Sequence, residues 1–175
     1  MDIGIRADGM TTSDFENFAI EIVKKKFENK SLHGFKEGRD AGIDGIDDIK
    51  SPTLILQAKR WQVTKNKTTA VKHLKEEIDK IALTKEKYGW VTDFKYVIVT
   101  SMGLSPANLK EIRDYADEII PNAIPTDDYI IYSSTLTTLS QQKEYRDVFM
   151  DYGLLEKDIS IILKSDRLKS VEAES

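Results

Sequence analysis

Apolar residues at intervals of three and four predict an amphipathic helix in the first part of the chain. The buried face of this helix would carry Phe15, Phe18, Ile22 and Val23. Ser13 and Glu16 match a capping box, with the serine as N-cap and the acid three residues later. We therefore expect the helix to begin at Ser13 and to end near Asn29.

Three short apolar segments then predict strands, at residues 33–36, 43–49 and 53–61. Ser51-Pro52 is a turn signal, so the second and third strands should form a hairpin. Strand side chains alternate between the two faces of a sheet. In the third strand this places Leu54, Leu56 and Ala58 on one face and Ile55, Gln57 and Lys59 on the other.

The middle of the chain predicts two helices around one strand. After the polar loop 64–69, a helix that ends at Gly89 has an apolar face. This face consists of Val71, Leu74, Ile78 and Ile81. The continuous apolar run 94–100 is typical of a buried parallel strand. Ser105 as N-cap, with Pro106 at the first helical position, begins a helix that ends near Ile120.

The last third of the chain predicts one more strand and a helical end. Residues 128–132 fit a strand, and residues 135–152 fit a helix that ends at Gly153. Residues 159–163 fit either a short strand or a helix. The predicted order is α-β-β-β-α-β-α-β with a helical C-terminal end, which belongs to the α/β class.

The composition is that of a globular domain: of 175 residues, 40% are hydrophobic and 32% are charged. The absence of cysteine excludes disulfides, thiolate zinc sites and cysteine nucleophiles. No apolar run is long enough to span a membrane and no signal peptide follows Met1, so we expect a cytoplasmic protein without a membrane partner. The sequence motifs of ATP-binding loops, zinc proteases and serine hydrolases are also absent.

Charge is divided unevenly along the chain. The net charge is −4, but residues 54–90 contain 9 Lys and Arg against 4 Asp and Glu, whereas residues 91–175 contain 9 against 15. Positive charge thus follows the third strand, where a phosphate backbone would need it. A solvated lysine-rich helix would explain the same excess.

Three polar residues form a candidate site at the hairpin: Asp44 before the turn, and Gln57 and Lys59 on the third strand. A buried strand has no packing use for an amide and an ammonium on one face, and both are costly there unless something binds them. A divalent metal between Asp44 and Gln57, with Asp44 as the countercharge of Lys59, would satisfy all three. The alternatives are a turn aspartate, an ordinary hydrogen-bonded glutamine and a lysine that snorkels to water.

The segments Gly42-Ile-Asp44-Gly45 and Gln57-Ala-Lys59-Arg60-Trp61 resemble the Mrr-like restriction endonuclease family of the PD-(D/E)xK nuclease superfamily. The strand from Tyr96 to Ser101 and the helix that starts at Ser105-Pro106-Ala107 are similar to the next elements of that family. The resemblance covers roughly residues 13–132 and is more specific than any single motif. It implies a restriction-endonuclease-like fold, with a central mixed β-sheet flanked by helices.

The resemblance also implies a Mg²⁺ site, in which Mn²⁺ could substitute. Its ligands would be the Asp44 carboxylate, the Gln57 amide oxygen and the backbone carbonyl of Ala58. Lys59 would orient the attacking water or stabilise the developing negative charge. Asp44, Gln57 and Lys59 are therefore the expected catalytic residues.

Glutamine at position 57 removes one negative charge from the site, and another carboxylate should compensate. Glu16 on the first helix is the family-like candidate, and Asp40 is nearer in sequence. Capping of the first helix would explain Glu16 fully, and a loop or DNA-proximal position would explain Asp40.

Cations and one aromatic ring near the third strand are candidate DNA contacts. They are Arg60, Trp61, Arg39, Lys36, Lys65 and Lys67. Core packing explains Trp61 nearly as well, and a solvated surface explains the individual lysines.

We therefore expect a metal-dependent DNA endonuclease of the restriction or antiphage-defence type. Residues 1–175 would form a single nuclease domain, with a core at 13–132 and an extension at 133–175, or the effector fragment of a longer protein. Cleavage of double-stranded DNA with one site per chain favours a homo-dimer or higher assembly, and a fused or associated recognition or NTPase module. The alternatives are a decayed nuclease fold that binds nucleic acid or assembles partners, and a nuclease for RNA or branched DNA.

Overall fold

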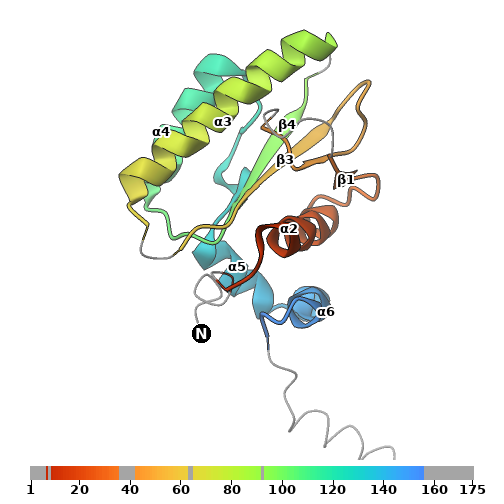
Figure 1. The fold of residues 1–175 in the computed structure, drawn as a ribbon, viewed down its shortest axis with the longest axis vertical. Coiled ribbons are helices and arrows are strands. Elements are labelled where there is room, and N and C mark those ends of the chain that lie inside the picture. Colours follow the sequence, from red (N-terminus) through yellow and green to blue (C-terminus); the bar gives the residue numbers. More distant parts are fainter. Residues whose placement is uncertain (1–6, 8, 36–41, 63–64, 92, 156–175) are drawn as a thin grey trace, which may run out of the picture.

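The computed structural model describes residues 7, 9–35, 42–62, 65–91 and 93–155. In this part of the chain, helices cover both faces of a five-stranded mixed sheet with the order β1-β2-β3-β4-β5 (Figure 1). The strands are β1 His33–Gly34, β2 Gly45–Ile46, β3 Leu54–Lys59, β4 Lys95–Thr100 and β5 Ile130–Ile131. The pairs β1–β2 and β2–β3 are antiparallel, whereas the pairs β3–β4 and β4–β5 are parallel. This confirms the predicted fold class and element order.

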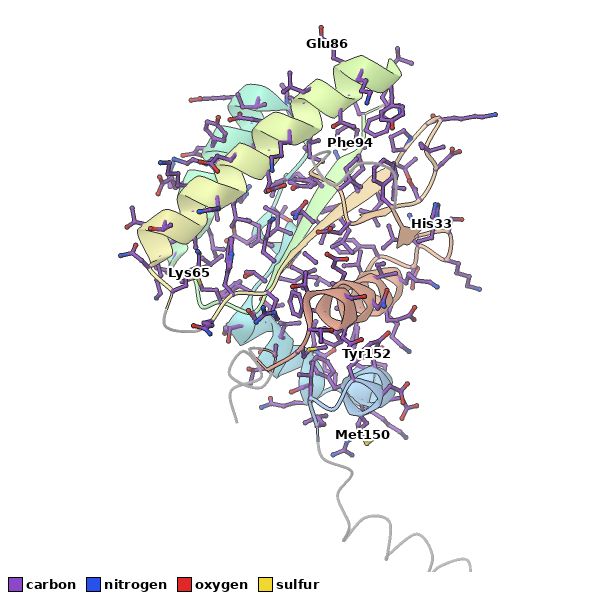
Figure 2. All side chains as sticks on the ribbon, in the orientation of Figure 1. His33, Lys65, Glu86, Phe94, Met150 and Tyr152 are labelled. Atoms are coloured by element: carbon purple, nitrogen blue, oxygen red, sulfur yellow. The ribbon has the colours of Figure 1, made fainter. Side chains whose placement is uncertain are left out.

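Two groups of helices enclose the sheet (Figure 1). One face is covered by α3 (Lys67–Tyr88) and α4 (Pro106–Ile119). The other is covered by α2 (Thr12–Lys26), α5 (Ser133–Ser140) and α6 (Arg146–Asp151), and the ring of Tyr152 after α6 packs on Phe18 of α2 (Figure 2). Each group buries its own hydrophobic cluster against the sheet.

The central strand β3 contributes to both clusters, as its alternating pattern predicts. Leu54, Leu56 and Ala58 are buried with α2, whereas Ile55 is buried with α3 and α4. The strand β4 pairs with β3 in parallel over its whole length and is buried from Tyr96 to Thr100. Burial on both faces explains why β4 is a continuous apolar run rather than an alternating one.

The hairpin between β2 and β3 is fixed by Asp47. Its Oδ1 accepts hydrogen bonds from the backbone N–H groups of Thr53 at 2.9 Å and Leu54 at 3.2 Å. Its Oδ2 accepts from Asn29 Nδ2 at 3.1 Å and from the Thr53 hydroxyl. These hydrogen bonds lower the pKa of Asp47 below its usual value despite partial burial. Asp47 therefore closes the turn and ties it to the chain that follows α2.

The predicted N-cap of the first helix is wrong. The helix begins at Thr12, and the Thr11 hydroxyl accepts a hydrogen bond of 3.1 Å from the Asp14 backbone N–H. Thr11 and Asp14 have the same spacing as Ser13 and Glu16, so two overlapping patterns competed and the earlier one forms the cap. Glu16 is consequently not part of a capping box with Ser13.

The predicted helix 135–152 is wrong in its continuity. It is divided into α5, a 3-10 turn at Lys143–Tyr145, and α6. In α5, the hydroxyls of Thr137 and Ser140 bond to backbone carbonyls of the preceding turn. Such bonds compete with helix propagation, which explains why a segment rich in serine and threonine stops early.

Other boundaries differ by a few residues, because β1, β2 and β5 are only two residues long and a 3-10 turn at Asp127–Tyr129 precedes β5. The prediction for residues 159–163 lies outside the described residues. Among the described helices, none has both the length and the apolar character needed to cross a membrane.

Candidate functional site

A pocket of about 640 Å³ opens at the C-terminal end of β3. It collects the three polar residues that the sequence singled out, together with residues of α2 and α3. Its lining is Thr12, Glu16, Phe35, Gly42, Ile43, Asp44, Gln57, Ala58, Lys59, Arg60, Trp61, Glu77 and Lys80. The structure therefore brings together Asp44, Gln57, Ala58, Lys59, Glu16, Arg60 and Trp61 from the predicted set.

The backbone of Asp44 is held by hydrogen bonds to the segments on either side of it. Its backbone N–H donates to the Leu56 carbonyl at 2.8 Å, and its own carbonyl accepts from the Phe35 N–H at 3.0 Å. Its side-chain Oδ2 accepts from the Ala58 N–H at 2.8 Å. Asp44 thus continues the antiparallel ladder beyond β2 and directs its carboxylate to the end of β3.

Burial raises the pKa of Asp44 to about 6. The hydrogen bond from Ala58 lowers this pKa and the nearby carboxylate of Glu16 raises it, while smaller effects of Lys59 and Glu77 oppose each other. Burial, the largest cause, removes the water that would otherwise stabilise the ionised carboxylate. A cation bound beside Asp44 would reverse the shift.

Gln57 is only 3% exposed, and its Oε1 has no hydrogen-bond partner among the described residues. Its Nε2 makes one long contact of 3.5 Å with the Ala58 carbonyl. An unsatisfied buried amide oxygen costs about 1–3 kcal/mol. The pocket therefore contains an oxygen that favours a ligand, and oxygen is the donor that Mg²⁺ prefers.

Lys59 contacts a residue that sequence reasoning missed. Its Nζ lies 3.1 Å from Oε1 of Glu77 on α3, and the Nζ of Lys80 lies 3.1 Å from the same oxygen. The signal for Glu77 was present: it lies three residues after Leu74 and four before Ile81, on the apolar face of the helix. An acid in that position predicts a buried polar contact.

Glu16 is half-buried on α2 and lines the pocket near Asp44. With the helix capped by Thr11, Glu16 is available to the site rather than to a capping box. Among the described residues, no three His, Cys, Asp or Glu side chains gather so as to hold a metal ion by themselves. A metal here would therefore need the neutral oxygens of Gln57 and Ala58 as well as carboxylates.

Trp61 extends the site beyond β3. Its backbone N–H donates to Ser101 Oγ at 2.8 Å, and the same hydroxyl donates to the Trp61 carbonyl at 2.6 Å. The half-buried indole lies edge-on to His73, with the ring centroids 6.2 Å apart, and the Lys65 Nζ lies 5.3 Å from its centroid. Trp61 therefore both packs on the second core and belongs to a surface patch with Lys65, which lies in the loop before α3 (Figure 2).

Of the other predicted DNA contacts, Lys67 is exposed at the first residue of α3. Lys67 is not among the residues that line the pocket. Lys36, Arg39 and Asp40 lie outside the described residues.

Gly42 sets the spacing between the Asp44 segment and α3. Its φ is +74°, and a Cβ added there would lie 2.8 Å from the Glu77 carbonyl oxygen and 3.0 Å from the Lys80 Cβ. Only glycine allows this approach without displacement of the helix. The close contact places the backbone of Glu77 directly against the loop that carries Asp44.

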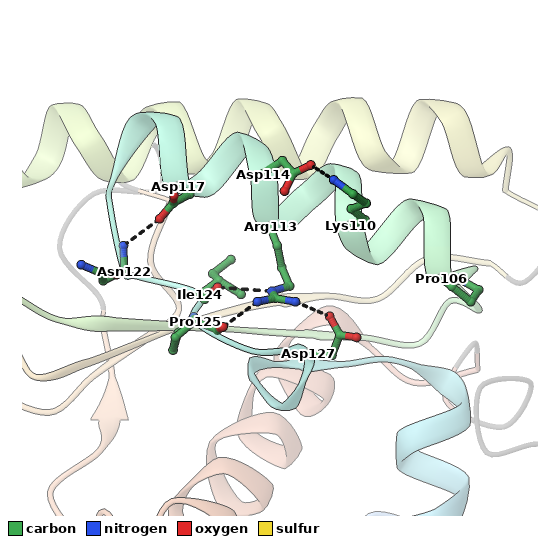
Figure 3. A pocket seen from close by; sticks show the side chains of 9 residues that line it. All are labelled: Pro106, Lys110, Arg113, Asp114, Asp117, Asn122, Ile124, Pro125 and Asp127. Atoms are coloured by element: carbon green, nitrogen blue, oxygen red, sulfur yellow. Dashed lines mark hydrogen bonds and ion pairs between the residues drawn. The ribbon is translucent and has the colours of Figure 1, made fainter.

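A second hollow, of about 560 Å³, lies beside α4 and is occupied by structural contacts (Figure 3). Arg113 donates to the carbonyls of Ile124 at 3.5 Å and Pro125 at 2.5 Å, and pairs with Asp127 at 3.2 Å (Figure 3). These bonds fix the segment that leads into β5. The polar groups that Arg113 contacts in this hollow therefore have a structural role.

Comparison with known proteins gives one result. A family model described as restriction endonuclease (Mrr_cat) matches residues 7–115, which is more than half of the chain. The match begins before α2 and ends within α4, so it includes the whole pocket at the end of β3. No curated protein and no solved structure matches the chain.

Proposed function

The chain belongs to the Mrr-type restriction endonuclease family, and on this premise we propose that it is a metal-dependent DNA endonuclease that hydrolyses phosphodiester bonds. The observation that carries the proposal is the buried Oε1 of Gln57, which has no hydrogen-bond partner among the described residues, in the pocket that also holds Asp44 and Lys59. A purely structural glutamine would be paired. A cation that binds oxygen would occupy the amide oxygen and would offset the effect of burial, which raises the pKa of Asp44.

The donor set fits a hard divalent cation. Asp44, the Gln57 amide oxygen and the Ala58 carbonyl would hold Mg²⁺ or Mn²⁺, and Glu16 is the carboxylate that would compensate for the missing acid at position 57. When bound, such an ion supplies Lewis acidity and activates water for attack on phosphorus. Asp44 must ionise to bind it, so metal affinity and protonation of Asp44 compete.

The remaining chemistry belongs to side chains of this chain. The Lys59 ammonium faces the pocket and would stabilise the negative charge that develops on the phosphate as water attacks. Arg60 and Trp61 follow it directly and would hold the neighbouring phosphate and sugar, with Lys65 and Lys67 further along the backbone. Lys36 and Arg39 remain proposed DNA contacts, and Asp40 remains the alternative to Glu16 as the additional carboxylate of the metal site.

We also propose duplex DNA as the substrate and a restriction or antiphage-defence role in the cytoplasm. Cleavage of both strands by one site per chain would need a homo-dimer or a higher assembly, with a fused or associated recognition or NTPase module. Residues 1–175 would then act as one nuclease domain, in which residues up to Leu154 complete the core under α2.

A plasmid assay tests the proposal. Purified protein is incubated with supercoiled plasmid and Mg²⁺ or Mn²⁺, beside Asp44→Ala, Lys59→Ala and an EDTA control. We expect nicking or linearisation by the wild type only. Lys50→Ala is the matched control, because Lys50 is exposed on the hairpin turn, before the start of β3, whereas Lys59 ends that strand. Cleavage retained by both Asp44→Ala and Lys59→Ala would contradict the mechanism.

One observation favours a second candidate, a nuclease fold without activity that binds nucleic acid. The described residues contain no group of three acidic or histidine ligands, and position 57 holds a neutral glutamine rather than an acid. Calorimetry with Mn²⁺ separates the two candidates. A decayed site binds no metal at millimolar concentration, whereas the proposed nuclease binds it and loses binding in Asp44→Ala.

A further inference from the structure

One carboxylate on α3 is shared by two lysines at the wall of the pocket. Oε1 of Glu77 lies 3.1 Å from Nζ of Lys59 and 3.1 Å from Nζ of Lys80. Glu77 is 8% exposed, so the shared carboxylate is buried, whereas the side chains of Lys59 and Lys80 are partly exposed at the pocket. Lys59 comes from the end of β3 and Lys80 from the next turn of α3, and both line the pocket.

The position of Glu77 is determined by its surroundings. Leu74, Ile78 and Ile81 on either side of it are fully buried against the sheet, which fixes the rotation of α3. The backbone of Glu77 packs against Gly42, where there is no space for a Cβ. The residue that carries the carboxylate is therefore the one whose backbone sets the distance between α3 and the Asp44 loop.

In contrast to the fixed carboxylate of Glu77, a lysine side chain is flexible. Its ammonium is carried on four methylene groups, and holding it in one place costs about 2 kcal/mol of rotamer entropy. A lysine at a strand end extends into water when nothing retains it. For Lys59, the carboxylate that retains it is Glu77, because among the described residues this is the one that forms an ion pair with the ammonium.

We propose that Glu77 is a positioning residue of the nuclease site. It holds the Lys59 ammonium at the pocket, while Lys80 contacts the same carboxylate oxygen. This inference rests on the proposed function. Two ammonium groups against one carboxylate leave a net positive charge at this wall, which suits an incoming phosphate. Glu77 would act through Lys59 and would bind neither metal nor DNA itself.

Glu77→Gln is the decisive variant, because glutamine keeps the shape and removes the charge. Glu76→Gln is the matched control: it makes the same change one residue earlier, on the exposed side of the helix. Single-turnover cleavage, duplex affinity in Ca²⁺, Mn²⁺ affinity and thermal stability are measured for both. We expect Glu77→Gln to cleave about 10- to 100-fold more slowly, with duplex and Mn²⁺ affinities unchanged. Glu76→Gln should cleave like the wild type.

A second readout does not depend on cleavage. Lysines are reductively methylated with ¹³C, and the Lys59 signal is assigned by its loss in Lys59→Arg. We expect this signal to shift in Glu77→Gln and to stay in place in Glu76→Gln. If the wild type fails to cut DNA, the proposed function fails, and the Lys59 signal still decides whether Glu77 holds the ammonium.

Three results would overturn the inference while the nuclease function stands. One is a wild-type cleavage rate in Glu77→Gln. Another is loss of Mn²⁺ binding in that variant, which would make Glu77 a metal ligand. The third is an unchanged Lys59 signal, which would show that the ion pair does not retain the side chain in solution.

Discussion

The Ala58 backbone N–H donates a hydrogen bond of 2.8 Å to Oδ2 of Asp44. This bond joins the loop before β2 to the strand that carries Gln57 and Lys59, 14 residues later in the chain. Because the donor is a backbone group in the middle of a sheet, it cannot move away when the side chains of the pocket rearrange. The carboxylate is thus pre-organised before any ligand arrives, which is what a precise site requires.

The raised pKa of Asp44 predicts a pH-dependent stability in the metal-free protein. With a folded pKa of about 6 against an ordinary aspartate pKa of 3.8, the folded state binds the proton more tightly. The free energy of unfolding should therefore fall as pH rises from about 4 to about 6, by at most about 3 kcal/mol. Urea denaturation at several pH values in EDTA measures this fall.

Asp44→Asn isolates the effect, because asparagine keeps the acceptor for Ala58 and cannot ionise. We expect this variant to lose the fall between pH 4 and 6, to exceed the wild type in stability at pH 8, and to gain nothing from added Mg²⁺. Asp93→Asn, at an exposed position, controls for a general change of charge. The same fall in Asp44→Asn and wild type would assign it to another group.

Gln57→Met predicts opposite changes in stability and metal binding. Methionine has a similar unbranched shape and lacks the buried Oε1 that has no partner, so the metal-free protein should gain about 1 kcal/mol. It should also lose Mn²⁺ affinity, measured by calorimetry. Gln57→Glu is the counterpart: it restores a carboxylate and should bind Mn²⁺ more tightly than the wild type. Equal Mn²⁺ affinity in all three proteins would exclude Gln57 as a ligand.

The sequence predicted those parts of the site that depend on local geometry. Asp44, Gln57 and Lys59 come together because a hairpin and a period of two determine their positions, and both can be read from the chain. The Glu77 contact joins Lys59 of β3 to a residue of α3 that lies 18 positions later in the chain, and it depends on how α3 is rotated on the sheet. The Gly42 contact depends on the same packing, so neither distance follows from spacing alone.

The errors in the helices have a different origin. At the start of α2, Thr11 and Ser13 are both good N-caps, and the energies of the two alternatives are too similar for the pattern to choose between them. In the segment 135–152 the sequence predicts one helix, but hydroxyl side chains that bond to the backbone end α5 early. Tertiary packing then determined where α6 begins.

Lys65→Ala tests the patch beside Trp61. If this lysine contacts a phosphate, its loss should weaken duplex binding about equally for all sequences and reduce the slope of log affinity against log salt by about 1. Fluorescence anisotropy over a range of KCl concentrations in Ca²⁺ measures both quantities. Lys50→Ala on the distant hairpin turn should leave the slope unchanged, and an identical slope in both variants would remove Lys65 from the DNA-binding surface.

Gly42→Ala should damage stability and cleavage together. Alanine at φ +74° is strained, and its Cβ would lie 2.8 Å from the Glu77 carbonyl oxygen. We expect a loss of about 2–4 kcal/mol in the free energy of unfolding. The clash would push α3 from the Asp44 loop, so cleavage should slow even at temperatures where the variant is fully folded.

Gly89→Ala separates strain from the clash. Gly89 has a similar φ of +66°, but a Cβ there would meet nothing within 4 Å. It follows α3 as its C-cap, so the two glycines lie at the same helix in different surroundings. We expect Gly89→Ala to lose only about 1–2 kcal/mol and to cleave normally when folded. Equal effects of the two substitutions on cleavage would mean that the spacing between Gly42 and Glu77 does not matter for the site.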